Sequence, residues 1–87
     1  MKINGEFILR EVVDEYVLIP VGDTALRFSG IIGLNPVSAF IWQKLQEGEE
    51  REELLAAILD EFEVSREQAG KDLDEFLEQL RNHQMLV

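Results

Sequence analysis

The 87-residue sequence predicts one small α+β domain spanning residues 1–87, in which three antiparallel strands precede three helices. Residues 7–34 are rich in β-branched and aromatic residues and are divided by turn-forming residues, a pattern typical of short strands. Residues 36–80 place apolar side chains three and four positions apart, the spacing of amphipathic helices. Neither half can bury its apolar side chains alone, so we expect the sheet and the helices to share one core.

Residues 7–19 predict a β-hairpin. Two apolar runs, 7–13 and 16–19, are separated by Asp14 and Glu15, which we expect to form a two-residue loop. Pro20 and Gly22 follow the second run and should end its strand.

Residues 28–34 predict the third strand. They include two glycines, Gly30 and Gly33, and a glycine within a strand often marks the close approach of another backbone. Exposed edge strands are usually protected by charges, proline or a bulge, and residues 29–34 contain no charge. We therefore interpret this strand as an open edge to which an extended peptide can add. A central strand that is buried on both faces fits the same residues and stays an alternative.

The first predicted helix begins at Asn35, an N-cap residue, with Pro36 in the first helical position. Gly48 should end it. Its inner stripe is predicted to consist of Val37, Phe40, Ile41 and Leu45, with Trp42 to one side of that stripe.

Two further helices follow. The second is expected over residues 50–62, where Leu55, Ile58, Leu59 and Phe62 form its apolar stripe. The third should begin at Ser65, which forms a capping box with Gln68, and should end near Asn82. Its predicted inner face consists of Ala69, Leu73, Phe76, Leu77 and Leu80, and residues 85–87 should cover the core. This order of elements fits a small winged-helix-like domain.

Negative charge is concentrated in the helical half. Residues 1–44 have a net charge of −1, whereas residues 45–87 have a net charge of −9. Nucleic acids and anionic membranes attract basic proteins, so neither is an expected partner. The field of this half would favour a basic partner, although solubility alone explains the same charge.

The residue types needed for catalysis are sparse. The chain has no cysteine and one histidine, His83, which we expect to be solvated near the end of the last helix. The serines lack an activating base, and no phosphate-binding loop or calcium loop is present. We therefore expect a non-catalytic binding module without a cofactor or a metal. No apolar run is long enough for a membrane span and no secretory signal is apparent, which favours a cytoplasmic protein.

Two segments, "LNPVSAFIWQKLQEG" and "FEVSREQAGKDLDEFLEQLRNHQML", resemble the PqqD family of pyrroloquinoline quinone biosynthesis and its relatives in ribosomal peptide maturation. The resemblance covers nearly the whole chain. One departure is Asn35-Pro36-Val37-Ser38, where the family often has Asn-Glu-Thr-Gly. The resemblance implies a winged-helix-type domain that binds the leader segment of a ribosomally made precursor peptide and presents it to a modifying enzyme, often a radical S-adenosylmethionine enzyme.

The resemblance also implies that the leader lies beside the third strand and against the third helix. The implied peptide-binding residues are Phe28, Ser29, Gly30, Ile31, Ile32, Gly33 and Leu34 on the strand and Asp72, Phe76, Gln79 and Leu80 on the helix. Core packing is the alternative role of Phe76 and Leu80, and Asp72 could be a solvated charge. A basic leader would suit the charge of the helical half.

Three alternatives stay open at this point. An acyl or peptidyl carrier needs a serine in an Asp-Ser-Leu setting, which Ser38 and Ser65 do not match. A winged-helix DNA-binding protein needs a basic recognition helix, whereas the third helix is acidic. A structural module could use the open strand to pair with a second copy of itself and form a homodimer.

Overall fold

The computed structural model describes residues 1–28 and 30–87, so the predicted peptide-binding residue Ser29 lies outside the described residues. The elements run in the order β1 (Phe7–Val12), β2 (Glu15–Pro20), α1 (Thr24–Arg27), β3 (Ile32–Leu34), α2 (Pro36–Gln46), α3 (Arg51–Glu61) and α4 (Arg66–Asn82). Three antiparallel strands followed by three longer helices confirm the predicted α+β class. The one-turn helix α1 between β2 and β3 was not predicted.

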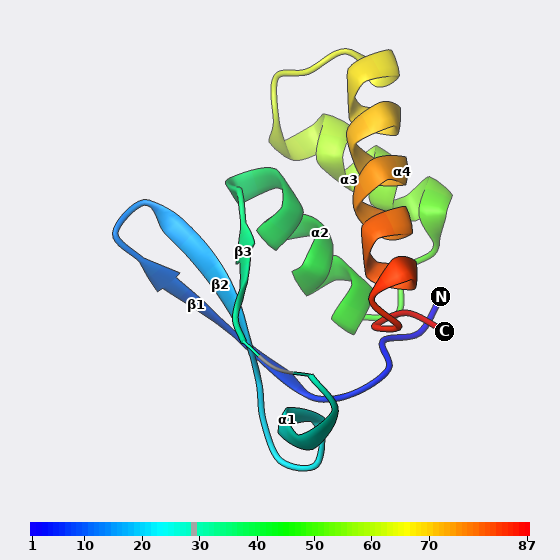
Figure 1. The fold of residues 1–87 in the computed structure, drawn as a ribbon. Coiled ribbons are helices and arrows are strands. Elements are labelled where there is room, and N and C mark those ends of the chain that lie inside the picture. The colour runs from blue at the N-terminus through cyan, green and yellow to red at the C-terminus, as the bar shows by residue number, and fades with distance from the viewer. Residues whose placement is uncertain (29) are drawn as a thin grey trace.

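The three strands form one antiparallel sheet in the order β1-β2-β3. Phe7 lies opposite Pro20 in the β1–β2 pair, and Leu18 lies opposite Ile32 in the β2–β3 pair. Side chains alternate between the two faces of a strand, so Phe7, Leu18 and Leu34 are buried against the helices. Helices α2, α3 and α4 all lie on this side of the sheet (Figure 1).

The hairpin turn differs by one residue from the predicted loop. Val12 pairs with Glu15, so Val13 and Asp14 form the loop, and both have positive φ angles of 39° and 63°. A two-residue turn with two positive φ angles matches the right-handed twist of the strands that it joins. The prediction of Asp14-Glu15 was therefore wrong, because the pairing of Phe7 with Pro20 and of Leu18 with Leu9 fixes the register.

The third strand is shorter than predicted. Thr24–Arg27 forms α1, in which the amide of Phe28 donates to the carbonyl of Thr24 at 3.0 Å. The buried Thr24 hydroxyl also accepts a hydrogen bond from the amide of Glu6 at 2.7 Å, which fixes α1 to the segment before β1. Gly30 has a φ of +88°, so the extended backbone of β3 begins only after it, at Ile32.

The helix starts follow the predicted caps. Asn35 Oδ1 accepts from the amide of Ser38 at 2.8 Å, and Ser65 Oγ accepts from the amide of Gln68 at 3.1 Å. The side chain of Gln68 donates to Asp72 Oδ1 at 2.8 Å instead of reaching back to Ser65, so only half of the predicted capping box forms.

The core is built mainly from α2, α3 and α4, and each strand adds one buried residue: Phe7, Leu18 and Leu34. All five predicted inner-face residues of α4 are buried: Ala69, Leu73, Phe76, Leu77 and Leu80. Trp42, predicted to lie to one side of the stripe of α2, is fully buried, and its ring meets Phe7 edge-to-face with centroids 5.4 Å apart. Of the predicted stripe, Val37 and Phe40 are only half-buried. Because α2 lies between the sheet and the other helices, two of its sides are covered.

The two ends of the chain lie together (Figure 1). Ile3 forms a β-bridge with Leu86, and the amide of Val87 donates to the carbonyl of Lys2 at 2.8 Å. Met85 and Leu86 are buried, as predicted for the tail, whereas Val87 is exposed. Within the described part of the chain, no helix is both long and apolar enough to cross a membrane.

Candidate functional site

β3 is an edge strand of the sheet. It pairs with β2 through Tyr16 and Leu34, Val17 and Gly33, and Leu18 and Ile32. Among residues 1–28 and 30–87, no strand pairs with its other side. The predicted open edge is therefore confirmed and the alternative of a central strand is wrong, although the strand itself spans only three residues.

The backbone near this edge has few side chains around it. Gly33 is exposed, and a Cβ atom built there would meet no described atom within 4 Å. Ile31 is 63 % exposed, whereas Leu34 points into the core. An incoming backbone would thus meet little steric hindrance beside β3.

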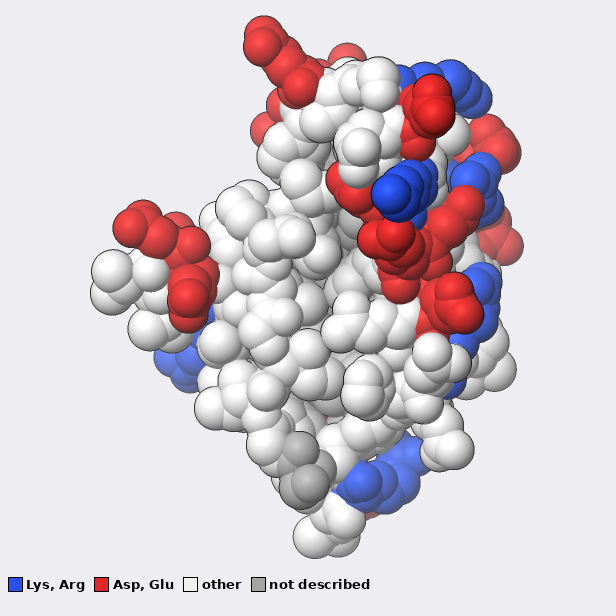
Figure 2. All heavy atoms as spheres, turned by 45° about the horizontal axis from the view of Figure 1, so that its top comes forward, with Lys and Arg blue, Asp and Glu red and all other residues white. Residues whose placement is uncertain are grey.

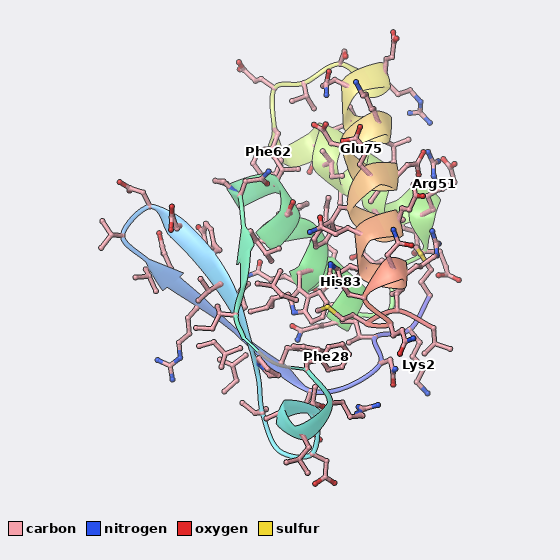
Figure 3. The ribbon with its side chains drawn as sticks, viewed as in Figure 1. Lys2, Phe28, Arg51, Phe62, Glu75 and His83 are labelled. Carbon is pink, nitrogen blue, oxygen red and sulfur yellow. The ribbon has the colours of Figure 1, made fainter. Side chains whose placement is uncertain are left out.

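Phe28 does not continue the strand. Its ring packs edge-to-face on Phe7 at 5.4 Å between centroids, and the guanidinium of Arg27 lies 5.8 Å from the ring centroid. Figure 3 shows Phe28 below the C-terminal end of α4. In this position the half-buried Phe28 supports the packing between sheet and helices.

A cavity of about 230 Å³ lies between the start of α2 and the middle of α4. We call it the α2–α4 cavity, and its lining residues are Asn35, Val37, Ser38, Asp72, Glu75, Phe76 and Gln79. The lining includes three of the four predicted helix residues. Leu80 is 1 % exposed and belongs to the core, so the structure separates it from the other three.

Local structure explains why the α2–α4 cavity lies at the end of β3. Asn35 follows Leu34 directly and caps α2. The residue after the end of β3 is therefore also part of the cavity wall. Asp72, Phe76 and Gln79 follow one another at helical spacing on one side of α4. That spacing also includes Glu75, which sequence reasoning missed. Val37 and Ser38 were missed because their position depends on how α2 packs.

The cavity lining contains two carboxylates and no basic residue. In Figure 2 acidic side chains on the right are interspersed with Lys and Arg, a second acidic group lies on the left, and uncharged residues form the middle of the same face. Arg51 is directed to Asp74 instead, with Nε–Oδ1 and Nη2–Oδ2 distances of 2.7 and 2.9 Å. The hydrogen bond from Arg51 lowers the pKa of the Asp74 carboxyl and raises that of the Arg51 guanidinium.

Four hollows are larger than the α2–α4 cavity, and two of them are more than twice its volume. One of about 590 Å³ lies between the N-terminal segment, the start of β1 and the end of α2. Another of about 680 Å³ lies between the first turns of α3 and α4. Neither is lined by β3 or by Asn35, the residue that follows it. A third hollow, of about 300 Å³, is lined by Gly33 and Leu34 together with Asn35, Pro36 and the turn between β1 and β2. In the part of the chain that the structure describes, no group of three His, Asp or Glu residues is placed to hold a metal ion.

Residues 15–86 match the family model described as Coenzyme PQQ synthesis protein D (PqqD). The chain belongs to the PqqD family. This finding confirms the resemblance drawn from the sequence and does not favour the carrier-protein alternative for this PqqD-family chain. No curated protein matches the chain significantly.

Two solved structures are similar to this PqqD-family chain. TbiB1, in complex with the TbiA(beta) leader peptide, has 34 % sequence identity and a TM-score of 0.75, and the match covers 99 % of this chain and 94 % of TbiB1. Lasso peptide synthetase B1, complexed with the leader peptide, has 21 % identity and a TM-score of 0.73, with 99 % of this chain and 95 % of that one covered. The second likeness shows the shared fold.

Proposed function

We propose that this PqqD-family protein binds the leader segment of a ribosomally made precursor peptide by strand addition to β3, and presents it to a peptide-modifying enzyme such as a radical S-adenosylmethionine enzyme. The observation that carries the proposal is the unpaired edge of β3, which leads directly into the α2–α4 cavity. TbiB1, a similar structure at 34 % identity, is in complex with a leader peptide.

Strand addition divides the work between backbone and side chains. The peptide backbone would form ladder hydrogen bonds with the free N–H and C=O groups of β3. These hydrogen bonds do not depend on the sequence of the peptide. Successive side chains of a strand point to opposite faces, so every second peptide residue would point toward α2 and α4. Those residues would meet the α2–α4 cavity and supply specificity.

In this proposal the chain does not catalyse a reaction. It holds the leader, and the rest of the precursor then stays near the enzyme at a raised effective concentration. Ribosomal precursors and their modifying enzymes are expected together in the cytoplasm, where we place this function.

The proposal can be tested with a library of random linear peptides displayed and selected on the immobilised protein. The selected peptide is then titrated into ¹⁵N-labelled protein, and backbone amide shifts are followed. We expect the largest shifts at Ile32, Gly33 and Leu34 and small shifts along β1. A protein that enriches no linear peptide, or a peptide that shifts β1 alone, contradicts the proposal.

Strand addition has a second signature in the peptide itself. Only every second amide of an edge-bound strand faces its neighbour, so N-methylation should weaken binding at alternate positions, by about fivefold for one lost hydrogen bond. Methylation at the positions between should be tolerated and serves as the control. A loss without this alternation would exclude the strand-addition mode.

A further inference from the structure

The α2–α4 cavity combines apolar walls with an acidic opening. Phe76 is buried and Val37 is half-buried, so both present hydrocarbon to the cavity, whereas Glu75 and Gln79 are exposed at its margin. The volume of about 230 Å³ holds roughly seven or eight groups of water size at about 30 Å³ each. This is the space of one long side chain.

The two carboxylates of the cavity have no basic partner within the described residues. The described ion pairs on α4 join Asp74 to Arg51 and Arg66 to Glu52, and neither includes Asp72 or Glu75. Asp72 Oδ1 accepts one hydrogen bond from the side-chain amide of Gln68, Nε2, at 2.8 Å. Figure 3 shows Glu75 midway along α4, away from Arg51.

A peptide bound along β3 would change the surroundings of these carboxylates. It would cover the α2–α4 cavity and remove water from Asp72 and Glu75, and burying an uncompensated carboxylate is costly. A cation supplied by the peptide removes that cost and forms a charge-assisted hydrogen bond. A neutral or acidic side chain at the same place leaves the cost in full.

We infer that the α2–α4 cavity receives one Lys or Arg side chain of the bound peptide, with Asp72 and Glu75 as its counter-charges. The hydrocarbon stem of such a side chain packs on Val37 and Phe76 while its charged end reaches the carboxylates, an arrangement suited to long basic residues. Because every second peptide residue faces the helices, one defined position of the peptide fills the cavity. This inference rests on the proposed function. It adds the class of peptide residue, a basic one, that the α2–α4 cavity recognises.

The peptides selected on the protein give the first test. We expect Lys or Arg to be enriched at one position of the peptide, at a constant spacing from the peptide segment whose binding shifts the amide signals of Ile32–Leu34. Replacing that residue with norleucine keeps the stem and removes the charge, and the dissociation constant should rise roughly tenfold at physiological salt. Isothermal titration calorimetry measures both peptides.

The decisive experiment combines this peptide pair with two protein variants of equal charge. In Asp72→Asn/Glu75→Gln, the tenfold difference between the basic and the norleucine peptide should shrink to less than twofold. The matched control is Glu63→Gln/Glu78→Gln, which removes two exposed carboxylates outside the cavity and should keep the full difference. Amide spectra of each double variant, free and with each peptide, verify that it is folded.

The outcomes separate this inference from the proposed function. Peptides that bind at β3 without a basic residue at a constant position overturn the inference and leave strand addition intact. Equal behaviour of the two double variants also overturns it, because the effect would then come from the overall field of the protein. A protein that enriches no peptide at all contradicts both.

Discussion

The sheet has two edges, and they differ in length, charge and surroundings. β1 spans six residues and includes Arg10 and Glu11, whereas β3 spans three residues and has no charged side chain. The hollow of about 590 Å³ beside the start of β1 is lined partly by the N-terminal segment, including Lys2 and Glu6. The smaller α2–α4 cavity beside β3 is formed by helices and has two carboxylates.

This difference shows how a small sheet can leave one edge open while discouraging contact at the other. Charged side chains along an edge strand disfavour pairing with a further strand, because they would have to be desolvated. β1 has such charges although two of its side chains, Ile8 and Val12, are 42 % and 54 % exposed. β3 lacks them and lies beside rigid helices, so an added strand there would be held from two sides.

The largest expected effect comes from removing the contact that holds β1 to the helices. Trp42→Ala should lower the free energy of unfolding by about 3–5 kcal/mol, because a large buried ring that packs on Phe7 is lost. Urea denaturation followed by far-UV circular dichroism measures the change.

Trp42→Phe is the matched control for this change. It keeps a ring against Phe7 and removes the Trp42 indole N–H, which is buried without a partner among the described residues. Its cost should therefore be clearly smaller than that of alanine. Equal losses in the two variants would show that the Phe7 contact is not the cause.

The second prediction compares the two edges directly by hydrogen exchange. With the selected peptide at about one hundred times its dissociation constant, exchange from the β3 segment should slow by up to about 100-fold, since binding adds about 2.7 kcal/mol to local opening. Exchange from Phe7–Val12 should change far less. Comparable slowing at both edges would mean that binding stabilises the whole fold without selecting β3.

A third prediction concerns the residue that joins β3 to the helices. Asn35→Ala should cost about 1 kcal/mol of unfolding free energy through loss of the cap, and should also weaken peptide binding because Asn35 lines the α2–α4 cavity. Ser65→Ala removes a cap of the same kind at the start of α4 and should cost a similar amount. Peptide affinity should stay unchanged in Ser65→Ala, and equal affinities in both variants would exclude a role of Asn35 in binding.

The smallest effect is expected at the Arg51–Asp74 pair, which joins the start of α3 to the middle of α4 and does not line the α2–α4 cavity. The pKa of Asp74 is lowered from its usual 3.8 by the hydrogen bond from Arg51, so its stabilisation is present at neutral pH and lost as pH falls through the lowered value. Asp74→Asn should therefore slightly reduce stability at pH 7. Thermal melts of both proteins should converge as the pH falls through the lowered pKa of Asp74, and a constant difference would contradict the assignment.

The sequence predicted the elements whose patterns are local. The inner face of α4 follows the helical period, and the Asn35 and Ser65 caps follow from residue type, so all of these were confirmed. The predicted start of the third strand at Phe28 was wrong because Phe28 ends the one-turn helix α1, and the positive φ of Gly30 delays the strand to Ile32. The contact of Trp42 with Phe7 was not predicted, because it joins distant parts of the chain.

The candidate site, like the fold, was predicted from the sequence only in part. The open edge followed from the absence of charge in residues 29–34, and Asp72, Phe76 and Gln79 followed from the family resemblance. Glu75 could have been added from helical spacing alone. Val37 and Ser38 could not, because only the packing of α2 on α4 brings them to the same cavity.

The bridge between Ile3 and Leu86 brings both chain ends to one place, remote from β3 in Figure 1. An affinity tag or a fused catalytic domain would be attached at the same place on the surface, whichever terminus carried it. The open edge of β3 would stay accessible in both cases. Genetic fusion at either terminus is therefore a practical way to immobilise this domain for peptide selection, and linker length rather than choice of end would set the reach of an attached enzyme.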